Sequence, residues 1–557
     1  MNADWLADAV LYEIYPQSFA DSGGDGVGDL RGVIGHLDHL SWLGVDAIWF
    51  NPCFTSPFVD AGYDVADYLS IAPRYGTNDD LVELVAKARE RGIRVLLDLV
   101  AGHTSDQHPW FRRELAAAGP DPDGDRYVWC DAPPYRDTSQ DTPGIAAWVP
   151  SPGPRPGYYL KNFYAAQPAL NFGWGSLPQD QTWRNSADAP GPRRNRQALK
   201  DVIAFWLDRG VAGFRVDMAF SLVKDDPGQV QTVALWREIG GWVRQRYPGA
   251  ALIPEGTEPR TRGADGSAAP CVFDADFFLV IHAPHASLLD NHSAGKLPWH
   301  PSVNPFFDAA GQGSTKIFMA HWTRAKANDP NRLVIMSTAD HDFDRLRCGP
   351  RTPEQLGTAL TFLLTWGNVP CIYYGDEIGM RYLPGLPDVE GAICNPQYNR
   401  AGCRTPMQWD DGRNAGFSTA DPQALYLPID PDPDRPTVAS QLADPGSTLH
   451  LVRRLVALRK TTPELGTRAT TTVLHDGYPL VYLRGERHLV VLNPALQTTS
   501  VSLPRAAAAN ALIAARPLLA QGVDIEGDVV TVDGFGFGIF ELGPSAVGTP
   551  ATTRSTT

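Results

Sequence analysis

Acidic side chains follow several short apolar runs of this sequence. A single polar residue at the end of a strand is usually structural. Carboxylates that converge on one rim of a fold would repel one another, however, so such an arrangement indicates a chemical role. The three acids of interest are Asp217, Glu255 and Asp342, which follow apolar runs at 211–216, 251–254 and 333–337.

Carboxylates of this kind suit glycosidic bond cleavage with retention of configuration. One acts as nucleophile, and a protonated partner roughly 5–5.5 Å away donates to the leaving oxygen. Asp217 is the better nucleophile candidate because Arg215, on the same side of the strand, favours its ionised form. Glu255 is the candidate general acid because partial desolvation and neighbouring carboxylates favour its protonated form. Glu258, three residues later, is the alternative acid.

These residues require a parallel sheet whose strands end at one rim. Apolar runs that resemble strands alternate with helical patterns, for example at 30–40 and 81–88. The alternation and the number of strands predict an α/β fold, a (β/α)8 TIM barrel. The eight expected strands are 10–15, 45–50, 95–100, 211–216, 251–254, 272–279, 333–337 and 369–374.

Two other segments lack this alternation. Residues 104–170 are rich in Pro, Gly, Asp and Tyr and are too long for a barrel connection, which predicts a subdomain inserted after strand three. Residues 470–545 contain β-rich runs without helices and predict a C-terminal β-sandwich. The barrel would then comprise 1–103 and 171–469, and the small polar residues 546–557 are expected to be disordered.

Composition excludes several classes of partner. The net charge of −15 and the lack of a basic stripe argue against nucleic acid. No apolar run reaches about 18 residues, so no membrane segment is expected. No signal-peptide pattern follows Met1, and the seven scattered cysteines fit reduced thiols. We expect a cytoplasmic protein that is a monomer or a small homo-oligomer.

The motifs around the acidic residues resemble those of the α-amylase family, glycoside hydrolase family 13. The resemblance implies that Asp217 is the nucleophile, Glu255 the acid/base and Asp342 the transition-state stabiliser. It also implies that His103, Arg215 and His341 hold the sugar, and that no cofactor takes part in catalysis. The matching segments are Asp98-Leu-Val-Ala-Gly-His103, Gly213-Phe-Arg-Val-Asp217, Glu255 and His341-Asp342, with Gln167-Pro-Ala-Leu-Asn171 resembling the fifth motif.

Residues 62–68 (GYDVADY) and 404–410 (RTPMQWD) resemble the oligo-1,6-glucosidase and α-glucosidase branch. In that branch, the residues that correspond to Asp64 and Arg404 pair across the pocket floor and bind the terminal glucose. The residue that corresponds to Tyr63 stacks on the glucose ring. A surface salt bridge is the alternative for this pair. The resemblance implies an exo-acting retaining α-glucosidase that hydrolyses a disaccharide or small oligosaccharide. Because the branch includes trehalose synthases, a glucosyltransferase or isomerase is the alternative.

Three positions depart from the family pattern. Gly102 replaces an Asn that holds calcium in many amylases, so we expect no calcium there. Asp340 replaces the usual Asn before His341 and adds a carboxylate. In this branch the residue that follows the nucleophile faces the +1 sugar, and Val there accompanies α-1,6 specificity whereas Ala or Thr accompanies α-1,4 specificity; this sequence has Met218 at that position. We therefore expect that neither maltose nor isomaltose is the preferred substrate; the alternative is that Met218 only fills the barrel wall.

The loop at 21–29 (DSGGDGVGD) alternates acidic residues with glycines. Oxygen ligands at this spacing suit a hard cation, and relatives bind calcium or magnesium here, usually with Asn in place of Gly23. We expect a structural Ca²⁺ or Mg²⁺ in this loop; a tight Gly-rich loop with solvated acids is the alternative. The expected ligands are Asp21, Asp25, Val27 and Asp29.

Overall fold

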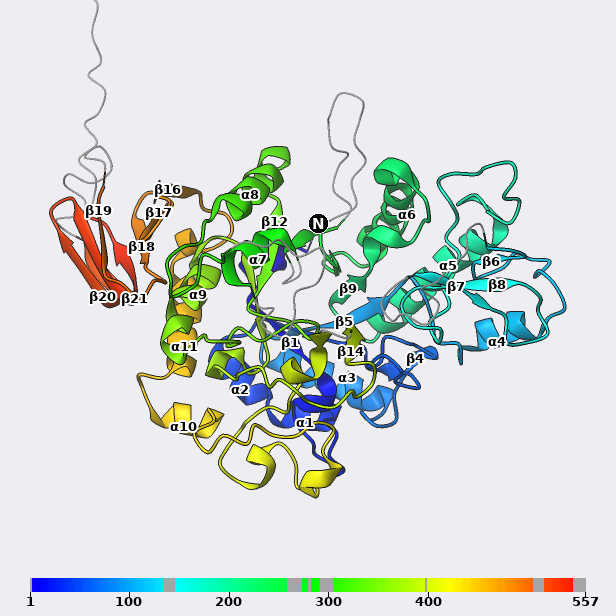
Figure 1. The fold of residues 1–557 in the computed structure, drawn as a ribbon, viewed down its shortest axis with the longest axis horizontal. Coiled ribbons are helices and arrows are strands. Elements are labelled where there is room, and N and C mark those ends of the chain that lie inside the picture. Colours follow the sequence, from blue (N-terminus) through cyan, green and yellow to red (C-terminus); the bar gives the residue numbers. More distant parts are fainter. Residues whose placement is uncertain are drawn as a thin grey trace, which may run out of the picture.

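The computed structural model describes residues 3–133, 146–257, 273–278, 282–290, 304–395, 398–503 and 515–543. Its centre is a parallel sheet of eight strands in the order β10-β9-β5-β2-β1-β13-β12-β11 (Figure 1). Backbone hydrogen bonds from Asp274 N to Leu252 O (3.0 Å) and from Phe277 N to Gly256 O (2.8 Å) join the two ends of this sheet. The strands are β1 (Leu11–Ile14), β2 (Ala47–Phe50), β5 (Arg94–Val100), β9 (Gly213–Asp217), β10 (Ala251–Pro254), β11 (Ala275–Phe278), β12 (Leu333–Ser337) and β13 (Val369–Tyr373).

The predicted (β/α)8 barrel is therefore confirmed, and each expected strand lies within about two residues of an observed one, apart from the undescribed ends of 272–279. Helices follow the strands, and α3 shows why they form where they do. A capping box of Thr77 and Asp80 begins it, and Leu81, Leu84 and Ala88 face the core. The barrel helices are α1 (Leu30–Gly35), α2 (Leu37–Leu43), α3 (Asn78–Glu90), α5 (Pro190–Leu207), α6 (Val230–Arg246), α7 (Ala283–Leu289), α8 (Lys316–Asn328), α9 (Pro353–Thr365), α10 (Val438–Ala443) and α11 (Thr448–Thr461).

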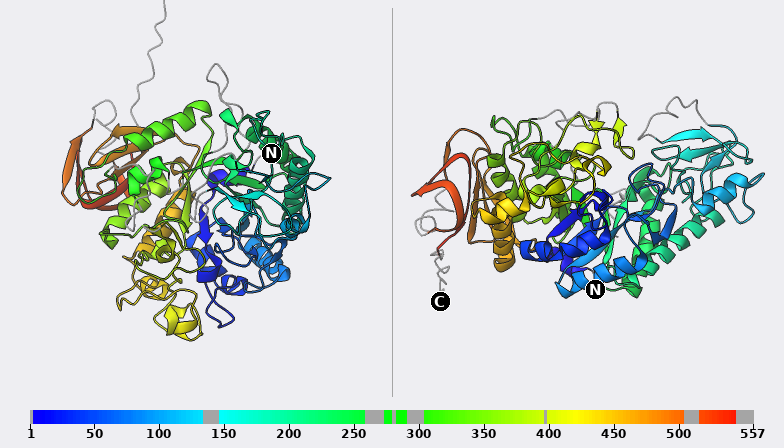
Figure 2. Two further views of the ribbon diagram at one scale, coloured as in Figure 1. Left: turned by 45° about the vertical axis from the view of Figure 1, so that its right-hand side comes forward. Right: turned by 90° about the horizontal axis from the view of Figure 1, so that it is seen from below.

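The segment between β5 and α5 contains α4 (Pro109–Ala116) and a small antiparallel sheet in the order β6-β8-β7. It has its own apolar cluster around Trp148 and Leu160. Figures 1 and 2 place it at the end of the molecule opposite the C-terminal strands. The strands are β6 (Trp129–Cys130), β7 (Ala147–Pro150) and β8 (Tyr158–Lys161); short pairs also form between β3 (Phe54–Thr55) and β4 (Asp67–Ile71), and between β14 (Ile393–Asn395) and β15 (Tyr398–Asn399).

The C-terminal region is all-β, and hydrogen bonds join its described strands into one sheet; its layering as a sandwich stays a prediction. The reason for the single sheet is the length of β21. Its second half pairs with β18 and its first half with β19, while β20 runs along its other edge. The strands are β16 (Thr471–His475), β17 (Leu480–Arg484), β18 (His488–Leu492), β19 (Thr499–Ser502), β20 (Arg516–Glu526) and β21 (Val529–Glu541).

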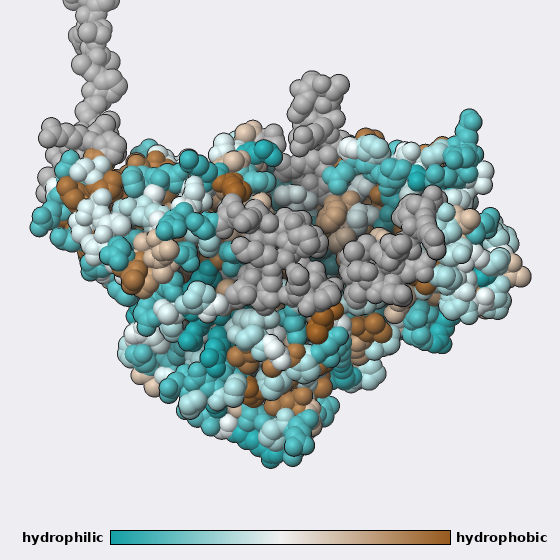
Figure 3. Space-filling view, in the orientation of Figure 1, coloured by the Kyte–Doolittle hydropathy of each residue, from teal (hydrophilic) through white to brown (hydrophobic). Residues whose placement is uncertain are grey.

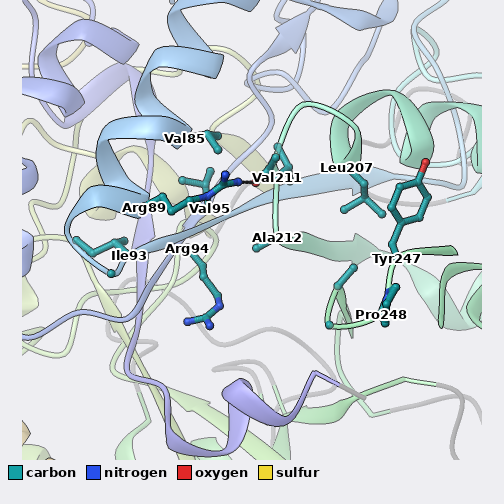
Figure 4. Close-up of a pocket in the computed structure, with 14 residues that line it drawn as sticks. Val85, Arg89, Ile93, Arg94, Val95, Leu207, Val211, Ala212, Tyr247 and Pro248 are labelled. Atoms are coloured by element: carbon teal, nitrogen blue, oxygen red, sulfur yellow. Dashed lines mark hydrogen bonds between the residues drawn. The ribbon is translucent and has the colours of Figure 1, made fainter. Parts of the chain in front are cut away.

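The face in Figure 3 is mostly hydrophilic, with apolar residues in small groups. Among the described residues, no helix is long and apolar enough to cross a membrane. A cavity of about 590 Å³ lies at the amino-terminal ends of β5, β9 and β10, where Arg89 donates to the Gly210 carbonyl (Figure 4). This is the end of the barrel opposite to the acidic residues, so this cavity is not the candidate active site.

Candidate active site

Strand β9 carries the centre of the site. Arg215 and Asp217 are two residues apart on it and therefore point to the same side. In the neighbouring β5, Asp98 lies opposite Arg215. Strand β10 runs along the other edge of β9 and is followed at once by Glu255, whose N–H donates to the Val216 carbonyl at 2.8 Å. Because all three strands are parallel, their carboxyl ends bring these groups to one rim.

The guanidinium of Arg215 connects the acidic groups. It lies 3.0 Å from both oxygens of Asp98, 3.0 Å from Asp217 Oδ1 and 3.1 Å from Glu255 Oε1. Burial alone would lower the pKa of Arg215, but the surrounding carboxylates raise it well above its ordinary value. The site therefore has a permanent positive charge that two of the three predicted catalytic acids share.

The two oxygens of Asp217 have different surroundings. Oδ1 is bound to Arg215, whereas Oδ2 is buried and has no hydrogen-bond partner among the described residues. Glu255 Oε2 accepts the backbone N–H of Met218 at 2.7 Å, in a left-handed turn where Met218 has φ of 50°. One carboxylate thus keeps a free oxygen for attack, and the other is held in a fixed orientation.

The protonation of Asp217 differs from the sequence expectation. Burial and the nearby Glu255 raise the pKa of Asp217 well above its usual range, and Arg215 only partly opposes them. Contact with Arg215 is present as expected, but it does not by itself keep the acid ionised. The dry surroundings and the neighbouring carboxylate therefore favour the protonated form of Asp217 more than its contact with Arg215 alone would suggest.

Asp342 has a different environment. Its Oδ1 lies 2.9 Å from Arg400 Nη1 and 3.2 Å from Arg404 Nη2, and its Oδ2 lies 3.5 Å from His341 Nε2. Burial favours the protonated form, but contacts with His341 and the two arginines hold the pKa of Asp342 well below its usual range. Asp342 is therefore ionised and can stabilise positive charge on a sugar ring.

The predicted pair between Asp64 and Arg404 is wrong. The carboxylate of Asp64 accepts the N–H groups of Val59 and Asp60, at 2.9 and 3.0 Å, and so supports its own loop. The guanidinium of Arg404 donates instead to the His341 carbonyl at 2.7 Å and to Asp342. Both residues support the pocket without meeting one another.

The pair that joins these two motifs is Asp60 with Arg400. Arg400 Nη2 lies 2.8 Å from Asp60 Oδ1, and Gln167 donates to Asp60 Oδ2 at 2.9 Å. Arg400 also binds Asp342, so it links the two motifs to the catalytic rim. The sequence analysis missed Asp60 and Arg400. Asp60 stands four residues before Asp64, and Arg400 four residues before Arg404. The two acids lie close together in the sequence, as do the two arginines, so the sequence alone does not show which acid pairs with which arginine.

The remaining predicted sugar-binding residues are buried beside these acids. Tyr63 donates to Asp98 at 3.0 Å, and its hydroxyl oxygen lies 2.8 Å from His341 Nε2. The rings of Tyr63 and His341 stack, with centroids 5.4 Å apart. Both ring nitrogens of His103 have protein partners, the Tyr63 carbonyl and the Asn162 amide, so His103 fixes the position of Tyr63.

A lysine lies where the inserted segment meets the barrel. The ammonium of Lys224 donates to the Ser221 carbonyl at 2.9 Å and lies 3.5 Å from Asn162 Oδ1. Asn162 Nδ2 in turn lies near His103 Nδ1 and the Gly102 carbonyl. Burial lowers the pKa of Lys224 to about 8. This cation, which the sequence analysis missed, occupies the junction next to Gly102.

Other predictions for this rim have mixed outcomes. Met218 is half-buried and its backbone N–H contacts Glu255; whether its side chain faces a +1 sugar stays a prediction. Asp340 accepts the N–H groups of Asp342 and Phe343, both at 3.0 Å, and so shapes the turn that carries Asp342. Glu258, the alternative acid, lies outside the described residues.

The loop at 21–29 does not fit a cation as it is arranged. All four carboxylate oxygens of Asp21 and Asp29 accept hydrogen bonds from backbone N–H groups. Asp25 accepts the N–H of Val27 at 3.0 Å. Among the described residues, no group of three or more His, Cys, Asp or Glu side chains could hold a metal ion. The geometry favours the alternative, a tight Gly-rich loop held by its own backbone.

We expect the melting temperature of the protein to be the same in EDTA as in excess Ca²⁺ or Mg²⁺. The reason is that the carboxylates of Asp21 and Asp29 already accept backbone N–H groups, and the described residues form no group of three or more acidic, His or Cys side chains that could hold a cation. Thermal unfolding under the three conditions measures this directly, because a ligand that binds only the folded state raises the melting temperature. A rise with either cation would instead support the metal site that the sequence predicts.

Comparison with known proteins gives consistent results. Residues 13–467 match the model of the α-amylase catalytic domain. A probable alpha-glucosidase of Rhizobium meliloti is 32% identical over 90% of this chain and 92% of its own length. The trehalose synthase/amylase TreS of Mycobacterium tuberculosis is 32% identical over 82% of this chain and 76% of its own. The solved trehalulose synthase MutB of Pseudomonas mesoacidophila has a TM-score of 0.77 and 25% identity, with 98% and 100% coverage.

Proposed function

The chain belongs to the α-amylase family, and from this premise we propose that it is an exo-acting, retaining α-glucosidase of short α-glucosides. Asp217 Oδ2 attacks the anomeric carbon while Glu255 gives its proton to the glycosidic oxygen, and the rest of the substrate leaves. Glu255 then removes a proton from water, and the water oxygen attacks the same carbon and releases Asp217. None of these steps needs a cofactor.

One observation carries this proposal: a single buried guanidinium contacts both Asp217 and Glu255 while Asp217 Oδ2 stays unpaired. The shared contact keeps the two acids close, and the free oxygen gives the nucleophile an available lone pair. Asp342, ionised and held by two arginines, supplies negative charge beside the ring at which positive charge develops.

The exo mode rests on the pair of Asp60 with Arg400. This pair joins the loop between β3 and β4 to the loop after β13, and Gln167 of the inserted segment supports it. Charged groups at this place suit the hydroxyls of a terminal glucose, and they would block a glucan chain that continued past it.

Transfer of glucose to another sugar is the second candidate. It is favoured by relatives at similar identity that are named trehalose synthase, and by solved neighbours that are named trehalulose synthase or alpha-glucosyl transfer enzyme. In that reaction a sugar hydroxyl takes the place of water in the second step. The catalytic residues would be the same, so only the products separate the two functions.

The deciding experiment follows maltose, isomaltose, sucrose and trehalose with the pure enzyme by proton NMR. We expect free glucose, released first as the α-anomer, because two inversions at one carbon restore its configuration. We also expect the specificity constants for maltose and isomaltose to be below the best in the panel.

Each outcome of this panel has a defined meaning. If new disaccharides form in place of free glucose, the protein is a glucosyltransferase and the proposed hydrolase function is wrong. An initial β-anomer would contradict the covalent mechanism. If maltose or isomaltose gives the highest specificity constant, the argument from Met218 fails. If Met218→Val or Met218→Thr moves the preference towards these sugars, Met218 governs linkage specificity.

A further inference from the structure

A fully buried glutamate lies beneath the catalytic rim and takes no part in the mechanism above. Glu13, on β1, has Oε1 at 2.8 Å from His341 Nδ1 and at 3.1 Å from Asn51 Nδ2. Its Oε2 has no hydrogen-bond partner among the described residues. Since His341 also lies against Asp342, Glu13 is one residue removed from a catalytic group.

The contacts of the other ring nitrogen, Nε2, show where the hydrogen of the neutral His341 ring lies. Tyr63 has one hydroxyl hydrogen and two partners, Asp98 Oδ2 at 3.0 Å and His341 Nε2 at 2.8 Å. The paired carboxylate of Asp98 can only accept, because both of its oxygens face Arg215. Tyr63 therefore donates to Asp98, and its oxygen must accept a hydrogen from His341 Nε2.

The position of the hydrogen on His341 then determines whether Glu13 carries a proton. Burial lowers the pKa of His341 to about 3, so the ring is neutral and carries only one N–H. With that hydrogen on Nε2, Nδ1 has an unshared lone pair. An ionised carboxylate 2.8 Å from this lone pair would repel it, so the short contact requires a hydrogen on Glu13 Oε1.

We propose that Glu13 is a positioning residue whose carboxyl group keeps its proton and donates it to His341 Nδ1, so that the Nε2–H is directed to the Tyr63 hydroxyl on the Asp342 side of the ring. The role of this N–H in turnover rests on the proposed function, whereas the tautomer itself does not. Asn51 Nδ2, 2.9 Å from Nδ1, supports the same tautomer.

The charges around Glu13 favour its neutral form. Asp340 and Asp342 face it from the loop after β12, and Cys371 and Tyr373 face it from β13, while Arg215 on β9 is the nearby cation. Burial, followed by the charge of Asp340, raises the pKa of Glu13 well above its usual range. These surroundings favour the protonated form of Glu13, which ionises as the pH rises. An ionised Glu13 would draw the hydrogen to Nδ1 and remove the N–H that holds the Tyr63 hydroxyl.

The tautomer can be observed without turnover. The ¹⁵N NMR spectrum of the full-length protein, labelled at histidine, distinguishes a protonated from an unprotonated ring nitrogen. The His341→Asn variant identifies the signals of His341 by their loss. We expect Nε2 protonated and Nδ1 unprotonated at neutral pH. A protonated Nδ1 would overturn the proposal whatever the enzyme catalyses.

Two variants then test the role of Glu13 in turnover. Glu13→Gln keeps an N–H donor for Nδ1 but cannot ionise, and Glu13→Met has a similar size and no donor. With an aryl α-glucoside we expect kcat/KM at neutral pH to fall at least about tenfold in the Met variant and to recover to within about threefold of wild type in the Gln variant. The alkaline fall of kcat/KM should move to higher pH in the Gln variant.

The outcomes separate the proposal from a structural role. If the Gln variant loses as much as the Met variant, or if it keeps the wild-type alkaline fall, Glu13 does not act through its proton. If neither variant changes kcat/KM while both fold with the wild-type melting temperature, Glu13 has no positioning role. Failure of the wild type to cleave the glucoside would reject the proposed function, and the NMR result would still decide the tautomer.

Discussion

Asp217→Asn should lower kcat by at least about 10⁴-fold on every α-glucoside, because the amide cannot form the covalent intermediate. Glu255→Gln should be similarly damaging on a natural glycoside, whose leaving oxygen needs a proton. The two variants should differ on an aryl glucoside with an acidic phenol. There the leaving group departs without protonation, so Glu255→Gln should form the intermediate and Asp217→Asn should not.

The measurement is single-turnover phenol release, with mass spectrometry to detect the glucosyl-enzyme. A small nucleophile such as azide should rescue Glu255→Gln, because it needs no general base, and should yield the α-glucosyl azide. Thermal unfolding controls for folding, since both substitutions keep side-chain volume. Near-wild-type activity of Glu255→Gln on a natural glycoside would make the acid/base assignment wrong, and Glu258 would be tested next.

Arg400→Met should reduce kcat/KM on disaccharides by roughly 10²–10³-fold, because it leaves two buried carboxylates without their shared cation. Asp60 would lose its 2.8 Å partner, and Asp342 would lose its 2.9 Å partner and with it part of the charge that holds its pKa low. The change therefore affects the binding of the terminal glucose and the ionisation of the transition-state stabiliser.

A matched control is Arg381→Met, which also breaks a paired arginine–carboxylate contact. Arg381 binds Asp430 at 2.7 Å, with about a third of its side chain exposed, and neither residue is part of the site described above. It should leave kcat/KM unchanged. Asp64→Asn should cost less than Arg400→Met, since Asp64 only supports the loop. Equal activity of Arg400→Met and wild type on disaccharides, or rapid mid-chain cutting of starch, would contradict the closed pocket.

The barrel and its acidic rim follow from short-range features of the chain. Apolar runs of strand length, each followed by a helical pattern, leave few arrangements other than a parallel barrel. Once the strands are parallel, a polar residue that follows a strand must lie at the same rim as its counterparts. The positions of Arg215, Asp217 and Glu255 could therefore be predicted from sequence, and the contacts of Arg215 confirm that these groups meet.

The charge state of Asp217 depends on its burial, which the sequence does not show. Sequence proximity of Arg215 to Asp217 suggested an ionised acid, whereas the dry surroundings and the neighbouring Glu255 raise its pKa. Likewise, the acid and glycine spacing at 21–29 suggested a metal, but the same spacing lets N–H groups of the loop satisfy the carboxylates. In both cases the spacing of residues along the chain limits which groups can meet. The three-dimensional arrangement decides which of them each carboxylate binds.

The sequence by itself determined the barrel, its order of elements and the motifs that form the site. Only the tertiary structure decided which residues of those motifs pair. Asp60 and Asp64, like Arg400 and Arg404, are separated by four positions, so each member is equally plausible from spacing alone. The fold directs Asp64 to N–H groups of its own loop and leaves Asp60 to meet Arg400. Glu13 and His341 lie 328 positions apart, and they meet because β1 and β12 lie on either side of β13 in the barrel sheet.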